Sequence, residues 1–309
     1  MNPQESVGLF GTPAQDLAAI PAGTVQFSPL IPGAAALEET APASLDRMIM
    51  VAPPGTLERR YVLALSMRAL KAGAPFLVMA PKAKGGGRIA AELESFGCNV
   101  CATSRRHHRI VETVRPMTFS AEVQARLDVA IAEGEPCFAE AIASWSQPGI
   151  FSWDRIDPGT ALLSSALPAP AGRGADFGCG LGIVARTVLA HPTVTHLDLV
   201  DIDRRAIAAA HRNVTDARVS FHWADLRRFS GLSELDFVVM NPPFHDGGAE
   251  DCTLGEAFIR RAHAALRGGG ALWLVANRHL PYESILASAF SRSVLRAEAS
   301  GFKVYEATK

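Results

Sequence analysis

The C-terminal half of the chain alternates short apolar segments with segments of helical spacing, and this alternation constrains the fold more than any other feature. The apolar segments include ADFGCGLG (175–182), LDFVVMN (235–241) and GALWLVAN (270–277). Strands that alternate with helices predict a parallel sheet covered by helices on both faces. The final segment, SVLRAEASGFKVYEAT (293–308), indicates two strands joined by a tight turn. We therefore expect an α/β, Rossmann-like sheet that is mostly parallel and ends in an antiparallel hairpin.

Length and composition narrow the class of protein. The chain has 309 residues, 48% of them hydrophobic and 20% charged, which is typical of a soluble globular protein with room for two domains. No apolar run reaches the roughly 18 residues of a membrane span, so we expect no membrane contact. Five cysteines without the spacing of a disulfide framework indicate a reducing, cytoplasmic setting. The net charge of −1 argues against a uniformly basic surface, but residues 80–116 hold seven Lys or Arg against three Glu.

Three predicted strands end in residues suited to a nucleotide-like ligand. In a parallel sheet, ligands bind at the carboxyl ends of the strands. The first of these strands ends in Asp176 and a turn with Gly178 and Gly180, where glycines let the backbone approach a ligand. Asp201, 23 residues after Gly178, is placed to accept hydrogen bonds from both hydroxyls of a ribose. Asp225 follows another strand, in a position to meet an adenine amino group.

The glycine turn alone fits two classes of enzyme. The pattern Gly180-x-Gly182-x-x-Ala185 also matches the loose fingerprint of dehydrogenases that bind a dinucleotide, in which an acid follows about 20 residues later. Two features favour a methyltransferase instead. Asp176 precedes the glycines, where the dinucleotide pattern requires no acid, and the sequence NPPF (241–244) closes the fourth strand, where hydride transfer has no use for it.

The loop Asn241-Pro242-Pro243-Phe244 fits transfer of a methyl group to an amine. An exocyclic amine on a nucleobase is a weak nucleophile because its lone pair is delocalised into the ring. Two acceptors aimed at its N–H groups, the side-chain oxygen of Asn241 and the backbone carbonyl of Pro242, would direct that lone pair toward the sulfonium methyl of S-adenosylmethionine. Pro242 and Pro243 fix the turn, and Phe244 offers a face on which a flipped base can stack.

These motifs give the chain a resemblance to a known family. The segments PGIFSWDRIDPGTALLSSAL, DFGCGLG, NPPFHDG, LWLVANRHLPYESIL and GFKVYEA, all within 148–309, resemble class I methyltransferases of the ribosomal RNA small subunit methyltransferase C type, which act on guanine N2. The resemblance implies S-adenosylmethionine as cofactor, ribosomal RNA or a ribosomal subunit as partner, and 241–244 as the catalytic loop. The residues that it implies around the cofactor are Asp176, Gly178, Gly180, Asp201 and Asp225, covered by a segment with Phe151, Asp157 and Gly159.

The first half of the chain contains a weaker echo of the second. The sequence MIMVAPPG (48–55) parallels VVMNPPF, and two further pairs follow in the same order, at offsets of 189, 196 and 194 residues. Ala52 stands where Asn241 stands, and no D-x-G-x-G-x-G turn precedes it. We therefore expect an irregular segment over 1–45, a degenerate, non-catalytic methyltransferase-like domain with a helical linker over 46–147, and a catalytic domain over 148–309.

Other interpretations stay open on the sequence alone. The loop at Asn241 also suits adenine N6 or a protein glutamine amide as acceptor, and a non-catalytic RNA-binding protein is a further alternative. Cys98-x-x-Cys101 has no second paired motif beside it, so we expect no metal. The basic runs APKAKGGGR (80–88) and SRRHHR (104–109) fit either a surface that faces RNA or a solvated loop. Oligomeric state and the target nucleotide have no signal in the sequence.

Overall fold

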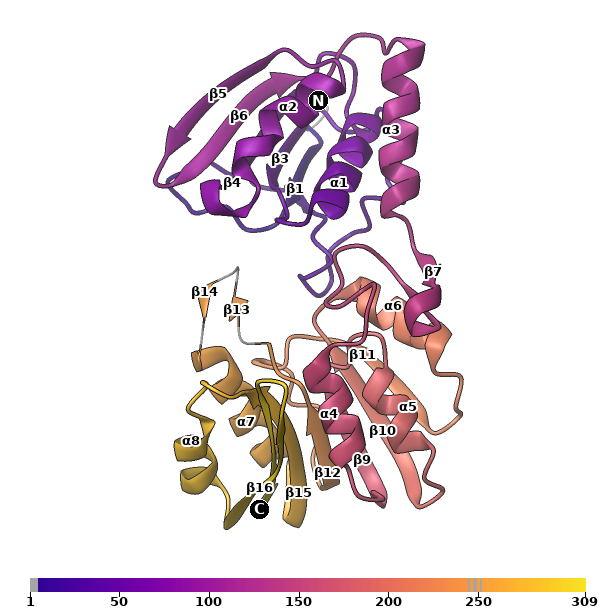
Figure 1. Ribbon diagram of the computed structural model, residues 1–309. Helices are drawn as coiled ribbons and strands as arrows, with labels where there is room; N and C mark the ends of the chain where they lie inside the picture. The colour runs from indigo at the N-terminus through magenta and orange to yellow at the C-terminus, as the bar shows by residue number, and fades with distance from the viewer. Residues whose placement is uncertain (1–4, 244, 247–248, 251) are drawn as a thin grey trace. The chain divides into compact units, whose positions relative to one another are not determined.

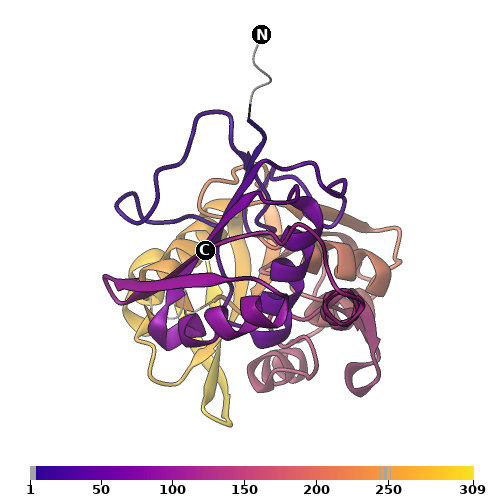
Figure 2. The ribbon, with the colours of Figure 1, turned by 90° about the horizontal axis from the view of Figure 1, so that it is seen from above.

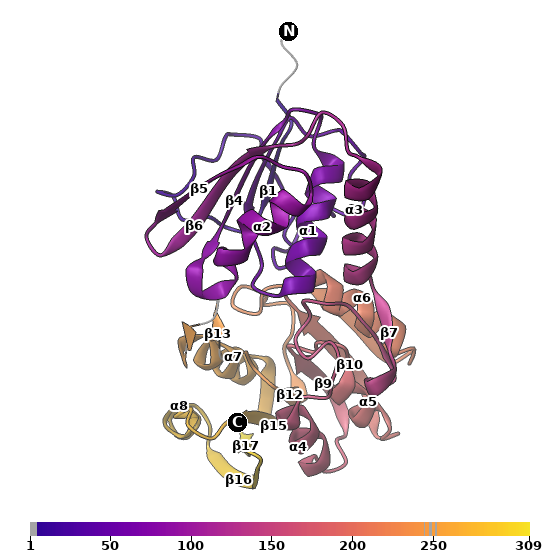
Figure 3. The same ribbon diagram turned by 45° about the horizontal axis from the view of Figure 1, so that its top comes forward.

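The computed structural model describes residues 5–243, 245–246, 249–250 and 252–309. The chain forms two compact units. The first contains Met1–Pro136 and Gln147–Gly149, and the second contains Cys137–Ser146 and Ile150–Lys309. Each unit has its own sheet and helices, as Figure 1, Figure 2 and Figure 3 show from three directions. Each also has its own hydrophobic core.

The second unit is built on a seven-stranded sheet with the order β11-β10-β9-β12-β15-β17-β16. The first five strands in that order are parallel, β17 is antiparallel to β15, and β16 and β17 form a hairpin at the edge. The predicted mostly parallel sheet with an antiparallel hairpin is therefore confirmed. The strands are β9 (Gly172–Phe177), β10 (Val194–Asp201), β11 (Val219–Trp223), β12 (Leu235–Met240), β15 (Leu266–Asn277), β16 (Arg292–Ala299) and β17 (Phe302–Thr308).

Both faces of the central strand β12 are buried, which explains why its last four residues, 237–240, are continuously apolar rather than alternating. On β12, Phe237 and Val239 pack with α4 (Pro158–Ala166), α5 (Ile183–Leu189) and α6 (Arg204–Asn213). The intervening Val238 and Met240 pack with α7 (Cys252–Ala265) and α8 (Tyr282–Ala289) on the other face. Figure 1 shows α4 and α5 in front of the sheet. The carboxyl ends of β9, β10 and β12 are therefore left as one edge on which a ligand site can form.

The first unit has a six-stranded sheet with the order β2-β1-β3-β4-β6-β5. Its first four strands in that order are parallel, and β6 and β5 again form an antiparallel hairpin. This order equals that of the second sheet with the strand equivalent to β11 missing. The strands are β1 (Val7–Phe10), β2 (Val25–Gln26), β3 (Arg47–Val51), β4 (Pro75–Pro81), β5 (Val100–Arg105) and β6 (His108–Val114).

The sequence echoes fall on strands with equivalent places in the two sheets. MIMVAPPG contains the end of β3, the counterpart of β12, and the other two pairs match β4 with β15 and β6 with β17. The sequence indicated an irregular segment over 1–45, but the structure places β1 and β2 there. The loop that follows β1 covers one face of the sheet, where Leu17 and Ala18 pack on a cluster that includes Ile49 and Met79.

The opposite face of the first sheet is covered by helices. They are α1 (Thr56–Ala69), α2 (Ile89–Ser95) and α3 (Ala121–Gly134), and α1 and α3 lie side by side in Figure 1 and Figure 3. The hydroxyl of Ser120 accepts a hydrogen bond from the backbone N–H of Val123 at 3.2 Å and so caps α3. The predicted helical linker is helical only up to Gly134. It continues as β7 (Cys137–Ala139), η3 (Glu140–Ile142) and β8 (Ser144–Ser146).

Candidate active site

A glycine turn follows β9 at the carboxyl edge of the second sheet. Gly178 and Gly180 have φ angles of 75° and 52°, a backbone region in which side chains with a Cβ are strained. A Cβ built on Gly180 would meet no atom within 4 Å, so the space in front of this turn is open. The backbone N–H of Gly180 donates to the carboxylate of Asp201 at 2.8 Å. The turn is thereby tied to the end of β10, and the structure brings these predicted residues together.

Asp176, the last but one residue of β9, is a buried carboxyl group that lacks a full set of partners. Its side chain is 2% exposed, and its Oδ2 atom has no hydrogen-bond partner among the described residues. Burial, and then the negative charge of Asp201, raise the pKa of Asp176 to about 8. A buried acceptor without a donor costs free energy, and a ligand that carries a positive charge and N–H groups would relieve that cost.

Asp201 ends β10 and is held by backbone donors. Its Oδ2 atom accepts from Gly180 and its Oδ1 atom accepts from the backbone N–H of Asp203 at 2.9 Å. Burial raises the pKa of Asp201 to about 6, although these N–H groups favour the charged form. Each carboxylate oxygen has a second lone pair, so the group retains acceptor capacity for two hydroxyls.

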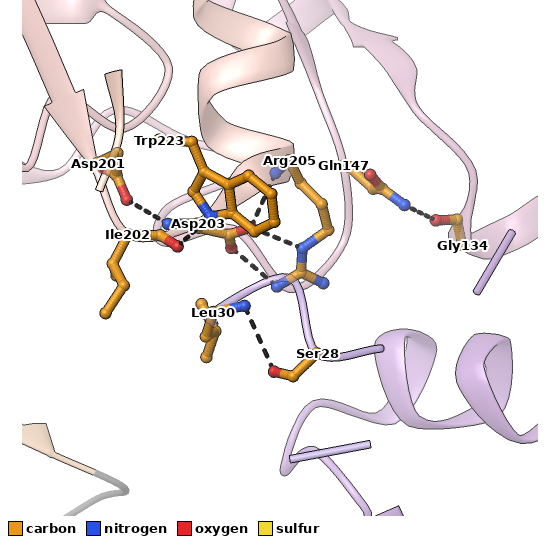
Figure 4. Close-up of polar contacts among 9 residues, drawn as sticks. All are labelled: Ser28, Leu30, Gly134, Gln147, Asp201, Ile202, Asp203, Arg205 and Trp223. Carbon is orange, nitrogen blue, oxygen red and sulfur yellow. Dashed lines mark hydrogen bonds and ion pairs between the residues drawn. The ribbon is translucent and has the colours of Figure 1, made fainter. Parts of the chain in front are cut away.

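The segment after Asp201 is fixed by its own contacts, which Figure 4 shows. The carboxylate of Asp203 caps α6 and pairs with Arg205 through bonds of 3.0 and 2.8 Å. The indole N–H of Trp223, at the end of β11, donates to the carbonyl of Ile202 at 2.8 Å. The ends of β10 and β11 therefore form one rigid border of the candidate site.

Asp225 lies just beyond β11, next to this border. The backbone N–H of Ala224 donates to the carbonyl of Asp201 at 2.9 Å, which brings the two acids to the same edge. The Asp225 carboxylate accepts from the backbone and the guanidinium of Arg227, and the Arg227 side chain is the main cause that lowers the pKa of Asp225. An adenine amino group would share this carboxylate with Arg227, and that contact stays a prediction.

Asn241 follows β12 and is oriented by the start of α4. Its amide nitrogen donates to the Oδ2 atom of Asp157 at 3.0 Å and to the hydroxyl of Thr160 at 2.9 Å. Asp157 is the N-cap of α4 and also accepts from the backbone N–H of Thr160 at 2.8 Å. A carboxylate can only accept, so it holds the nitrogen side of the amide and leaves the Asn241 oxygen free for another donor.

The glycine turn and the asparagine loop are neighbours. A Cβ built on Gly178 would lie 3.9 Å from the backbone carbonyl oxygen of Asn241. In the loop, Pro242 is buried and Pro243 is exposed, whereas Phe244 lies outside the described residues. The predicted residues Asp176, Gly178, Gly180, Asp201 and Asn241 therefore share one edge of the sheet. Asp157, which the resemblance placed in a segment over the cofactor, lies against Asn241.

Sequence reasoning missed Thr160. A local signal for it exists, because the sequence Asp157-Pro-Gly-Thr160 is typical of a helix N-terminus, where an acid caps the third helical residue. The contact of Thr160 with Asn241 spans 81 positions in the chain and has no local signal.

Cys179, between two glycines of the turn, is not placed to act as a nucleophile. Its side chain is buried, and burial together with the charges of Asp201 and Asp176 raises the pKa of its thiol well above the usual value. The nucleophilic form of cysteine is the thiolate, which this environment disfavours.

Metal and membrane sites find no support in the part of the chain that the structure describes. Within that part, no group of three or more His, Cys, Asp or Glu side chains is arranged to hold a metal ion. Cys98 is buried and Cys101 is exposed on β5. No helix among the described residues is long and apolar enough to cross a membrane.

The equivalent loop of the first unit, Ala52 to Gly55, is hydrogen-bonded to a buried arginine. The side chain of Arg59 on α1 is fully buried and binds both carboxylate oxygens of Glu92, each at 2.7 Å. Its Nη1 atom donates to the carbonyl of Pro54 at 2.8 Å and lies 3.5 Å from that of Pro53. Carbonyls that would face a ligand in an open loop are thus engaged by the protein itself.

The sheet order, the glycine turn after β9 and the Asn-Pro-Pro loop after β12 together define a class I methyltransferase that uses S-adenosylmethionine. Residues 141–306 match the family model described as Methyltransferase small domain. Relatives named Ribosomal RNA small subunit methyltransferase C include the protein of Pseudomonas entomophila, which is 30% identical over 279 residues, 86% of this chain and 80% of the relative. The protein of Psychromonas ingrahamii is 32% identical over 269 residues, 84% and 74% of the two chains. The chain belongs to the ribosomal RNA small subunit methyltransferase C family.

A solved structure has the same fold over the whole chain. The T. thermophilus 16S rRNA N2 G1207 methyltransferase, in complex with AdoMet and guanosine, matches with a TM-score of 0.78 at 21% sequence identity. The match covers 100% of this chain and 89% of the other. Both units therefore belong to the common fold.

Proposed function

We propose that this protein transfers the methyl group of S-adenosylmethionine to the exocyclic N2 amine of a guanine in small-subunit ribosomal RNA, in the cytoplasm. The observation that carries the proposal is the orientation of Asn241, whose amide nitrogen is bound by Asp157 and Thr160 while its oxygen stays available. Membership of the family supports ribosomal RNA as substrate. The printed activity of the structural neighbour supports guanine over the adenine and glutamine acceptors.

The residues at the carboxyl edge fit S-adenosylmethionine, which supplies an activated methyl group when bound. Asp176 is buried and one of its oxygens has no hydrogen-bond partner in the described part of the chain, so it suits the ammonium group of the cofactor. Asp201 suits the ribose hydroxyls. The open space in front of Gly180 lets the backbone approach the ligand closely. Positive charge on the ligand would also favour the ionised form of Asp176, whose pKa is raised by burial and then by the negative charge of Asp201.

The chemistry asked of the protein is to orient an amine. The Asn241 oxygen and the Pro242 carbonyl would accept hydrogen bonds from the two N–H groups of guanine N2, which turns the lone pair toward the methyl group. Asp157 and Thr160 keep the Asn241 amide from rotating, so the acceptor is in place before the substrate binds. The amine gives up its proton after attack, so no strong base is required.

Mapping of modified nucleosides by mass spectrometry tests the proposal. Ribosomal RNA from cells without this protein should lack one N2-methylguanosine, and the wild-type gene should restore it. An unchanged modification pattern would exclude the proposed reaction. Loss of N6-methyladenosine instead would move the assignment to the adenine alternative.

Thr160 provides a more specific test of how Asn241 is held. Thr160→Val keeps the shape of the side chain but removes the hydroxyl that accepts from Asn241. Loss of one hydrogen bond predicts a decrease in kcat of about three- to tenfold, with an unchanged dissociation constant for S-adenosylmethionine. Steady-state kinetics and calorimetry measure both values, and Thr160→Ser, which retains the hydroxyl, is the matched control. A Thr160→Val enzyme with wild-type kcat would mean that Asp157 alone orients the amide.

A further inference from the structure

One end of the first sheet collects positive charge that the proposed reaction does not use. The 3-10 helices η1 (Lys82–Lys84) and η2 (Gly86–Arg88) follow β4, and the tip of the β5–β6 hairpin lies beside them. Pro81 pairs with His108, and the backbone N–H of Lys82 donates to the carbonyl of His107 at 2.8 Å. We call this region the cationic hairpin surface; it consists of Lys82, Lys84, Arg88, Arg105, Arg106, His107, His108 and Arg109.

The charges of this surface are mostly not neutralised by the protein. Among the described residues, its only ion pair joins Arg106 to Asp16 at 2.7 Å, and the Arg106 side chain is still 69% exposed. Lys82, Arg88 and Arg105 are exposed and make no ion pair within that part of the chain. Like charges gathered at one end of a sheet repel each other, so this arrangement does not serve the stability of the fold.

The hairpin tip also has unfavourable residues for its backbone conformation. Arg106 and His107 form a two-residue turn closed by the pair Arg105 and His108, and their φ angles are 46° and 60°. A turn with both φ angles positive favours Asn-Gly because a side chain with a Cβ is strained there. Backbone strain that does not stabilise the fold is often found at functional positions, so Arg106 and His107 are candidates for a functional role.

The second unit shows that the same turn forms with other residues. Ser300 and Gly301 occupy the equivalent turn of the β16–β17 hairpin, with φ angles of 52° and 83°. The backbone N–H of Arg278 donates to the carbonyl of Gly301 at 2.8 Å, as Lys82 does to His107. The same turn geometry and the same backbone hydrogen bond thus occur twice in the chain, once with the residues Ser-Gly and once with Arg-His. Folding of the hairpin therefore does not require Arg106 or His107.

We infer that the cationic hairpin surface binds phosphate groups of the RNA substrate. The inference rests on the proposed function for the identity of the polyanion. Exposed guanidinium and ammonium groups recognise phosphate by charge, and arginine adds paired hydrogen bonds. Contacts to phosphate position the RNA and carry no sequence information by themselves. The first unit, without a catalytic loop, thereby acquires a role in substrate binding.

Two full-length variants separate this role from a general effect of charge. The first is Lys82→Gln with Lys84→Gln and Arg105→Gln, three residues without an ion pair among those described. Its control is Arg60→Gln with Lys71→Gln and Arg126→Gln, three cations of the same unit that pair with Glu133, Asp46 and Glu122. Both variants change the net charge by the same amount, so only the place of the charge differs.

The measurement is binding to transcribed small-subunit ribosomal RNA at several salt concentrations. The slope of log K against log salt should fall by roughly one unit for each lost phosphate contact in the first variant and stay unchanged in the control. The KM for RNA should rise at constant kcat, because a phosphate contact binds ground state and transition state equally. The inference would be overturned if the salt dependence of RNA binding had the same slope in the wild type and the first variant, or if both variants lost the same RNA affinity. The surface would then bind an acidic protein partner or be only solvated.

Exchanging the two turn residues tests the hairpin tip in a protein that should fold normally. Arg106→Ser with His107→Gly gives the first hairpin the residues of the second, so its melting temperature should be no lower than that of the wild type. The exposed ion pair with Asp16 contributes little to stability. RNA affinity should nonetheless decrease, and full RNA affinity in this variant would contradict a role of the tip.

Normal RNA binding by the wild type without any methyl transfer would refute the proposed function and leave this inference standing.

Discussion

Replacing Asn241 with alanine is expected to lower kcat by about a hundredfold or more, because one preorganised acceptor at the reacting amine is lost. Affinity for S-adenosylmethionine should stay nearly unchanged, since the glycine turn, Asp176 and Asp201 are intact. Single-turnover kinetics with saturating cofactor, together with calorimetry, separate the two quantities. A parallel loss of cofactor affinity would show that Asn241 binds the cofactor rather than the acceptor base.

The first unit supplies an internal control for this result. Ala52→Asn, introduced into the Asn241→Ala protein, should restore no activity. Ala52 is 4% exposed, and the Arg59 guanidinium already engages the carbonyl of Pro54 in the same loop. Measurable methyl transfer from the double variant would reveal a second cofactor site in the first unit.

Asp176→Asn is expected to weaken S-adenosylmethionine binding by about ten- to a hundredfold, the loss that corresponds to a charged hydrogen bond. Asparagine retains the size of the side chain and removes the negative charge that suits an ammonium group. Calorimetric titration of the variant gives the affinity. An unchanged dissociation constant would remove Asp176 from the cofactor site.

The same substitution should alter how stability depends on pH. Asp176 and Asp201 have folded pKa values of about 8 and about 6, both above the ordinary value of 3.8. On these two carboxyl groups the folded protein therefore holds more protons than the unfolded chain between about pH 4 and 8, so their contribution to the free energy of unfolding falls as pH rises through this range. In ligand-free Asp176→Asn, the part of this decrease above about pH 6 should be smaller. Thermal melts at several pH values measure it.

Cofactor affinity of the wild type should change in the opposite direction. A positively charged ligand prefers the ionised form of Asp176, so binding at pH 7 should release protons and tighten as pH approaches 8. Calorimetry in two buffers with different ionisation enthalpies counts the protons released. Binding without proton release would contradict the raised pKa.

The catalytic sheet was predictable because its signals are local. The run from Leu235 to Met240 is apolar at every position except Asp236, which is the pattern of a strand buried between two layers of helices. The acids Asp176 and Asp201 lie at the carboxyl ends of neighbouring parallel strands, so their meeting at one edge follows from parallel topology alone.

The elements that sequence reasoning missed depend on distant partners. Strand β2 has only two residues, Val25 and Gln26, and exists because Gly8 and Leu9 pair with them. The contact of Asn241 with Thr160 is likewise decided by how α4 packs against β15 and β17, and no local pattern contains that information. The burial of Arg59 against Glu92 joins residues 33 positions apart for the same reason.

That buried pair would make a catalytic loop in the first unit difficult to build. Removing Arg59 alone would leave the carboxylate of Glu92 without its cation and the Pro54 carbonyl without its donor. Breaking a buried pair costs about 3–5 kcal/mol, a large part of the 5–15 kcal/mol that a typical domain has. Asparagine at position 52 gains nothing while Arg59 remains. A catalytic loop in the first unit would thus need several simultaneous substitutions, each harmful or neutral alone, so single mutational steps are not expected to produce one.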